Sequence, residues 1–271
     1  MNIKVFAKKW LPPALISHLK PLLKYGIYYS GNYPDWAAAE IHASGYDYTL
    51  ILERVKQARL KVMAGDAKYE RDSVLFEEVQ HSFPVLAGLL RAAIENGDQL
   101  SVLDFGGSLG SSYFQCRDFL SVLPSLKWGV VEQEHFVRCG REQFETEQLK
   151  FYSTIAECIR QAKPNVVLLS SVLQYLPEPY AILDELITSE IPYIIIDHTP
   201  FSKNEEDRIT VQQVPASIYA ASYPCRILGE QSLHKIFHGR YEALAWFDSS
   251  YGSAISNGLE FAFRGMILRK I

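Results

Sequence analysis

A glycine-rich segment carries the residues whose types and spacing point most directly to chemistry. Residues 101–112 read SVLDFGGSLGSS, an apolar run that ends in an acid and glycines and is followed by a helix start. This order predicts a strand, a tight turn and a helix. Glycines let backbone N–H groups approach a ligand closely, and a helix N-terminus carries partial positive charge. The segment therefore predicts a site for a nucleotide-like ligand.

The spacing of the glycines separates two classes of nucleotide-binding turn. A dinucleotide fingerprint requires G-x-G-x-x-G, but Ser108 and Ser111 stand at its third and sixth places when it is counted from Gly106. A nicotinamide-dependent oxidoreductase is therefore disfavoured. The segment instead resembles the first motif of class I S-adenosylmethionine-dependent methyltransferases, an acid-x-Gly-x-Gly-x-Gly pattern. Asp104, Gly106 and Gly110 match it, and Ser108 replaces the middle glycine.

A longer likeness extends the resemblance beyond the turn. The string DFGGSLGS is similar to that of a bacterial methyltransferase family associated with surface-polysaccharide genes, and the likeness runs from about residue 33 to the C-terminus. The resemblance implies a Rossmann-like sheet of seven strands, mostly parallel, with an antiparallel last strand. It also implies that Gly106, Gly107, Ser108 and Gly110 hold the amino-acid part of S-adenosylmethionine, while Asp104 orients the turn.

The carboxyl ends of the next two predicted strands supply further candidate cofactor contacts. In open α/β sheets ligands bind beyond these ends. Glu132 ends the strand-like run 128–132, where a carboxylate can accept hydrogen bonds from both ribose hydroxyls. Ser153 ends the following short strand and offers a hydroxyl near the expected position of an adenine.

The fourth predicted strand leads into the string SSVLQYLPEP, which contains Ser171 and Gln174. It resembles the family segment that lines the methyl-donor pocket, and many relatives have His where Gln174 stands. Because an amide takes no proton at neutral pH, Gln174 would position a ligand rather than act as a base.

His198, next to Asp197 after the fifth predicted strand, is our candidate general base. An imidazole titrates near neutrality and can take the proton of an acceptor hydroxyl. Strand alternation places only one of these two side chains on a given face, so a structural or cofactor-contacting histidine is an equal alternative. Arg71, in the charged string YERDS, is a candidate for binding the cofactor carboxylate, with a surface ion cluster as its alternative.

The periodicity of apolar residues predicts the elements that position these groups. Residues 1–97 read as a helical extension or cap, with helices over 48–63 and from about 84. Residues 98–271 read as the α/β core, a doubly covered parallel sheet. Within it, 199–229 exceeds an ordinary strand–helix loop and is expected to be a substrate-loop insertion, in which Tyr219, Tyr223 and Arg226 contact the acceptor or pin the loop to the body. A terminal antiparallel pair is expected over 241–247 and 259–268.

The composition limits which binding partners and which cellular compartment are expected. The formal net charge of -4 offers no general attraction to nucleic acid. The four cysteines form no C-x-x-C pair, and the histidines show no metal-ligand spacing, so we expect a cytoplasmic protein without a bound metal. Five lysines precede the first acid, Asp35, interleaved with leucines. This basic N-terminus is either a surface helix or a peripheral membrane contact.

These observations predict an S-adenosylmethionine-dependent methyltransferase that acts on oxygen, with a small-molecule or saccharide acceptor. The saccharide is implied by the family resemblance, not by the residues themselves. Two alternatives stay open. A non-catalytic cofactor-binding module of the same fold is suggested by Ser108 and Gln174, which depart from common patterns, and a nicotinamide-dependent oxidoreductase is the less favoured one.

Overall fold

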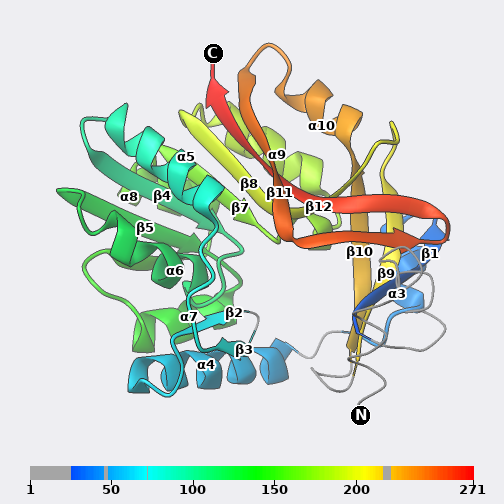
Figure 1. Cartoon of the computed structure of the whole chain (residues 1–271), viewed down its shortest axis with the longest axis horizontal. Helices are drawn as coiled ribbons and strands as arrows, with labels where there is room; N and C mark the ends of the chain where they lie inside the picture. The colour runs from blue at the N-terminus through cyan, green and yellow to red at the C-terminus, as the bar shows by residue number, and fades with distance from the viewer. Residues whose placement is uncertain (1–25, 46–47, 72, 216–220) are drawn as a thin grey trace.

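The computed structural model describes residues 26–45, 48–71, 73–215 and 221–271 (Figure 1). The strands are β1 (Tyr28–Tyr33), β2 (Tyr69–Arg71), β3 (Val74–Phe76), β4 (Gln99–Phe105), β5 (Ser125–Val131), β6 (Leu149–Tyr152), β7 (Val166–Ser170), β8 (Tyr193–Ser202), β9 (Arg208–Val214), β10 (Ala221–Gly229), β11 (Tyr241–Ser256) and β12 (Leu259–Lys270). The helices are α3 (Trp36–Ile41), α4 (Tyr48–Ala64), α5 (Phe83–Ile94), α6 (Ser111–Leu120), α7 (Glu134–Gln143), α8 (Ile155–Ala162), α9 (Pro179–Thr188) and α10 (Glu230–Phe237), with a 3₁₀ turn η1 (Leu173–Tyr175).

The central sheet is mostly parallel and Rossmann-like, as predicted. Its strands β6, β5, β4, β7 and β8 lie side by side in that order and run parallel. In chain order this is third, second, first, fourth, fifth, the arrangement that creates a switch point beside the first strand. The last strand β12 pairs antiparallel with β8, and β11 pairs antiparallel with β12. The antiparallel end of the sheet is confirmed.

Helices cover both faces of this sheet because its strands are apolar on both sides. Alternate residues of β4 show the division: Val102 belongs to one buried cluster and Leu103 to the other. Residues of α5, α6 and α7 build the first cluster, and residues of α8, α9 and α10 build the second. Two cores therefore hold the strand ends rigidly in place.

The prediction of seven strands was wrong, because the sheet contains ten strands within the described part of the chain. Seven of them form the core just described. The other three, β1, β9 and β10, form an antiparallel sheet that joins the core where Leu228 and Gly229 pair with Phe201 and Ser202 of β8. Figure 1 shows β11 and β12 running from the core across to these added strands.

The segment 199–229, expected as a loop insertion, is largely strand. β8 continues through Ser202 because β12 pairs with it as far as Phe201, and the rest forms β9 and β10. Arg226 and Tyr223 pin the segment: Arg226 contacts Asp207 at 3.3 Å, and the Tyr223 hydroxyl accepts a hydrogen bond from Gln212. Tyr219 lies outside the described residues, and the assignment of this segment to acceptor binding stays a prediction.

The N-terminal extension is not purely helical within its described part. Helices α4 and α5 match the predicted positions, but β1 and the β2–β3 hairpin accompany them. β1 is rich in tyrosine, and Tyr29 packs edge-on against Phe261 at a ring distance of 5.1 Å. Aromatic residues favour strands where such partners exist, and those partners lie far away in the sequence.

The expected membrane contact of the basic N-terminus falls on residues 1–25, outside the described part of the chain. Among the described helices, none combines the length and apolar character needed to cross a membrane.

Candidate functional site

Asp104 lies at the carboxyl end of β4 and is almost fully buried. Its Oδ2 accepts a hydrogen bond from the indole Nε1 of Trp128 at 2.9 Å. The following turn folds directly over this carboxyl group, since a Cβ on Gly107 would stand 2.4 Å from Oδ2. Burial raises the pKa of Asp104 to about 7. The carboxyl group of Asp104 thus supports the turn from the interior of the protein and does not face the surface.

The turn itself combines three left-handed residues. Gly106, Ser108 and Gly110 have φ of 72°, 55° and 87°, and α6 begins directly afterwards at Ser111. A Cβ on Gly106 would approach the side chain of Val172 to 2.5 Å. Positions 106 and 107 therefore require glycine, because a side chain there would collide with Val172 or Asp104. The backbone amides of the turn lie directly before the N-terminus of α6.

Glu132 follows β5 at the neighbouring strand end. Its Oε1 accepts from the backbone N–H of Ser108 at 3.3 Å, and its Oε2 accepts from the N–H of Gln133 at 2.7 Å. Burial raises its pKa, and these two backbone hydrogen bonds oppose that effect. The structure thus brings Glu132 and the glycine turn together, as predicted for one binding site.

Ser153, Ser171 and Gln174 differ in what they contact. Ser153 is exposed, and its hydroxyl donates to Glu134 at 2.8 Å. Gln174 is buried, and its Nε2 donates to the Ser171 hydroxyl and to the backbone carbonyl of His198, each at 3.2 Å. Gln174 therefore fastens the end of β7 to β8. The cofactor-binding roles of these three residues stay predictions.

His198 has a left-handed backbone with φ of 49°, and this breaks the alternation of β8. The expectation that Asp197 and His198 lie on opposite faces was therefore wrong. Nε2 of His198 lies 3.4 Å from Oδ2 of Asp197, while Nδ1 hydrogen-bonds to the hydroxyl of Ser249. Burial and the nearby Arg71 lower the pKa of His198 to about 3, so the imidazole is neutral at physiological pH.

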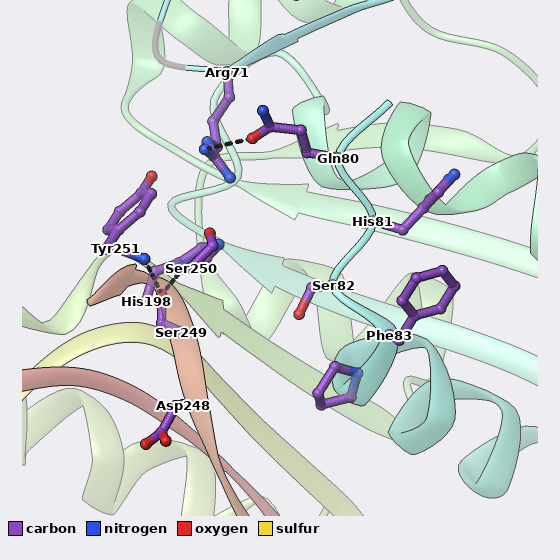
Figure 2. A pocket seen from close by; sticks show the side chains of 11 residues that line it. Arg71, Gln80, His81, Ser82, Phe83, His198, Asp248, Ser249, Ser250 and Tyr251 are labelled. Atoms are coloured by element: carbon purple, nitrogen blue, oxygen red, sulfur yellow. Dashed lines mark hydrogen bonds between the residues drawn. The ribbon is translucent and has the colours of Figure 1, made fainter. Parts of the chain in front are cut away.

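A cavity of about 650 Å³ opens above His198 (Figure 2). Four segments line it: β2 with Arg71, the start of α5 with Ser82, β8 with His198, and the kinked middle of β11 with Ser249 and Tyr251. It lies at the carboxyl edge of the sheet, because Asp197 pairs with the last residue of β7.

Arg71 reaches this cavity, while Asp72 of the same charged string lies outside the described residues. Its guanidinium donates to Gln80 at 3.3 Å and lies 4.9 Å from the ring centre of Tyr251. Among the described residues, the structure gives no contact between Arg71 and the glycine turn. Its predicted binding of a cofactor carboxylate stays a prediction.

Sequence reasoning missed the contribution of β11. The segment DSSYG over 248–252 lies between the predicted strands 241–247 and 259–268, yet β11 runs through it with a register shift between Asp248 and Ser253. A glycine inside a strand, here Gly252, is a signal of such an irregularity. The shift places Ser249, Ser250 and Tyr251 on the cavity wall.

Comparison with known proteins finds likeness at the level of solved structures. No protein-family model and no curated protein matches the chain. The N-terminal domain of EvdMO1, solved in the presence of SAH and D-fucose, is 15% identical, with 83% of this chain and 98% of that domain covered and a TM-score of 0.46.

Two further solved structures cover somewhat less of the chain. CalS10, an amino pentose methyltransferase from Micromonospora echinaspora with SAM bound, is 11% identical. The match covers 71% of this chain and 92% of CalS10, with a TM-score of 0.42. Magnesium protoporphyrin IX methyltransferase from Synechocystis PCC 6803 with bound SAM is 15% identical. The match covers 72% of this chain and 86% of that enzyme, with a TM-score of 0.40. Likeness at these values carries no argument about the reaction, which has to come from the residues of this chain.

Proposed function

We propose that this chain is an S-adenosylmethionine-dependent methyltransferase that methylates a hydroxyl oxygen, with a saccharide or a saccharide-linked metabolite as acceptor. The observation that carries the proposal is the pairing of Glu132 with the turn amide of Ser108, at adjacent strand ends of a Rossmann-like sheet. A cavity with a neutral histidine lies at the same edge of the sheet.

The residues present fit such a cofactor. Each oxygen of Glu132 accepts one backbone hydrogen bond and keeps a further lone pair, so the carboxylate can receive two ribose hydroxyls. The left-handed turn presents amides at the start of α6, where the carboxylate of an amino acid is stabilised. When bound, S-adenosylmethionine supplies an electrophilic methyl group.

The chain's own contribution is positioning and exclusion of water. Methyl transfer requires the acceptor oxygen to be held in line with the donated group, and such orientation accounts for a large part of the rate. The cavity walls from β2, α5, β8 and β11 can hold an acceptor from four sides. The imidazole of His198 is neutral and so has a lone pair for the acceptor's proton, but its lowered pKa makes it a weaker base than an ordinary histidine. The saccharide itself rests on the family resemblance of the sequence.

Binding of the cofactor tests this proposal through Glu132. We expect micromolar binding of S-adenosylmethionine and S-adenosylhomocysteine in isothermal titration. Glu132→Ala should weaken it by about 1–3 kcal/mol, the usual cost of losing a charged hydrogen-bonding partner. Glu142→Ala is the matched control, since this exposed acid lies on the following helix α7.

Three other results would each redirect the assignment. If both substitutions weaken cofactor binding equally, Glu132 is not a cofactor-binding residue. Binding without methyl transfer to any acceptor would favour the non-catalytic module. Competition by reduced nicotinamide cofactor would instead favour the oxidoreductase.

A further inference from the structure

Ser249 lines the cavity beside His198. The register shift in β11 after Asp248 turns this hydroxyl toward the end of β8, where it hydrogen-bonds to Nδ1 of His198 (Figure 2). Ser249 is 8% exposed and still belongs to the cavity wall. Its position makes it the polar group through which a cavity ligand can reach the imidazole.

Both ring nitrogens of His198 already have neighbours. Nδ1 bonds to Ser249, and Nε2 lies 3.4 Å from Oδ2 of Asp197. An acceptor hydroxyl therefore has no vacant ring nitrogen to approach directly. If the histidine is to receive its proton, the proton has to pass through one of these two neighbours, and of the two only Ser249 lines the cavity.

The arrangement of donors and acceptors determines which direction a proton takes. A carboxylate opposite Nε2 favours the tautomer that carries hydrogen on Nε2, which leaves the lone pair on Nδ1. The Ser249 hydroxyl then donates to Nδ1. Its oxygen accepts the backbone N–H of Tyr251 at 3.2 Å and retains a second lone pair. That lone pair can accept a hydrogen bond from a hydroxyl in the cavity.

We propose that Ser249 is a catalytic proton relay, which takes the proton of the acceptor hydroxyl while it passes its own proton to Nδ1 of His198. The proposal rests on the proposed methyltransferase function. The acceptor O–H bond breaks as its oxygen bonds to the donated methyl group, and the electron pair of the broken methyl–sulfur bond stays on sulfur. The imidazole ends with the proton, opposite the Asp197 carboxylate.

The groups around His198 support this direction. The ring of Tyr251 stacks on the imidazole at 4.3 Å and 14°, which holds the ring plane. Burial and Arg71 from β2 keep the imidazole neutral before reaction, and because both also disfavour the imidazolium, the Asp197 carboxylate opposite Nε2 is needed to stabilise it once the proton arrives. Asp197 on β8 is held by the His198 backbone N–H and a hydrogen bond from Ser82 at the start of α5, and burial raises its pKa to about 6. Asp248 on β11 is exposed at the cavity rim, and its carboxylate pairs with Arg264 at 3.5 Å and points away from His198 (Figure 2).

The histidine tautomer provides a test that needs no acceptor. Nitrogen-15 NMR of histidine-labelled protein should show hydrogen on Nε2 of His198, with the signal assigned through His198→Gln. It should also show no protonation between pH 8 and 5. Ser249→Ala should shift the Nδ1 resonance, because the donor to its lone pair is lost. Hydrogen on Nδ1 would overturn the relay, since the imidazole would then donate to Ser249 and could not take its proton.

Turnover provides the second test. Methyl transfer from radiolabelled S-adenosylmethionine is measured with methyl glycosides and nucleotide-linked hexoses as acceptors. We expect Ser249→Ala to lower kcat at least tenfold with KM within about threefold, and Ser249→Thr, which keeps a hydroxyl, to restore most of the rate. The wild-type kcat should rise with pH through about 6, as Asp197 loses its proton, and Asp197→Asn should remove that rise.

The outcomes separate the relay from the function on which it rests. Unchanged turnover in Ser249→Ala overturns the relay and leaves the methyltransferase in place. Absence of cofactor binding overturns the methyltransferase and, with it, the catalytic role of Ser249. If the cofactor binds but none of these acceptors is methylated, the tautomer of His198 decides the relay.

Discussion

Of the eight non-glycine residues with left-handed backbone in the described part of the chain, three lie at the carboxyl edge of the parallel strands: Ser108, Ser171 and His198. Such a conformation costs an ordinary residue free energy, and it persists only where the surroundings impose it. Here each is fixed by hydrogen bonds, of the Ser108 N–H to Glu132, of the Ser171 N–H to the carbonyl of Asp197, and of the His198 N–H to the Asp197 side chain. The first two of these bonds connect neighbouring strands of the sheet at the candidate site.

Asp104 yields a prediction about stability and pH. Its pKa is about 7 in the folded chain against an ordinary value of 3.8, so between these pH values the native protein holds a proton that the unfolded chain has lost. The free energy of unfolding should therefore fall as pH rises from about 4 to 7, by about 1.4 kcal/mol for each unit of pKa difference. Asp104→Asn should flatten the fall, because the amide oxygen still accepts from Trp128 without ionising.

Urea unfolding at pH 5, 6, 7 and 8 measures this effect. The slope that remains in Asp104→Asn belongs to groups such as Glu132 and Asp197, whose pKa burial also raises. An identical pH dependence in both proteins would mean that Asp104 ionises as easily in the folded chain as in the unfolded one.

At the scale of elements, the turn between β4 and α6 is more constrained than its glycine pattern suggests. Gly107 is required by its packing on Asp104, and Gly110 by its φ of 87° at the helix start. Ser108 is the one residue of the turn with φ above zero that is not glycine. The departure from the acid-x-Gly-x-Gly-x-Gly pattern thus keeps the backbone conformation that a glycine would adopt.

Replacing Ser108 by glycine should therefore relieve strain. We expect Ser108→Gly to raise the free energy of unfolding by up to about 1 kcal/mol, because glycine adopts the left-handed region without the Cβ penalty. The control is Ser121→Gly, at φ of -63° after α6, which should destabilise by about 1 kcal/mol. Thermal unfolding measures both, and destabilisation by Ser108→Gly would show that its side chain holds the turn.

At the scale of the whole molecule, Asp207 couples the added sheet of β1, β9 and β10 to the core. Its carboxylate receives the hydroxyl of Tyr180 on α9 at 2.8 Å, the N–H of Gly229 at 2.9 Å and the guanidinium of Arg226 at 3.3 Å. Because β10 and β8 share only two paired positions, this carboxylate reinforces a narrow junction.

We expect Asp207→Ala to lower stability by about 2 kcal/mol, since it leaves Arg226 and Tyr180 without their shared partner. Amide hydrogen exchange should accelerate first in β9 and β10, while the parallel strands stay protected. Asp118→Ala is the control, because its pair with Arg117 is exposed and contributes little. Equal acceleration throughout the sheet would mean that the added strands and the core unfold as one unit.

The sequence by itself determined the order of the core elements and the glycine turn. Continuous apolar runs, a glycine cluster and acids at the ends of those runs are local signals. They can be recognised in the sequence without knowing which strands pair in the fold. They located Asp104 and the turn at the end of β4 and Glu132 at the neighbouring strand end, and they predicted the antiparallel end of the sheet.

Only the tertiary structure decided the strand count and the composition of the cavity. The added sheet forms because β1 pairs with β9 and packs against the aromatic cluster around Phe261, and both of these are distant from β1 in the sequence. Alternation could not foresee the left-handed His198 or the register shift that brings Ser249 to it, because both depend on strands pairing across long separations. A cavity with four walls from separate segments is a product of those long-range contacts, and no local pattern encodes it.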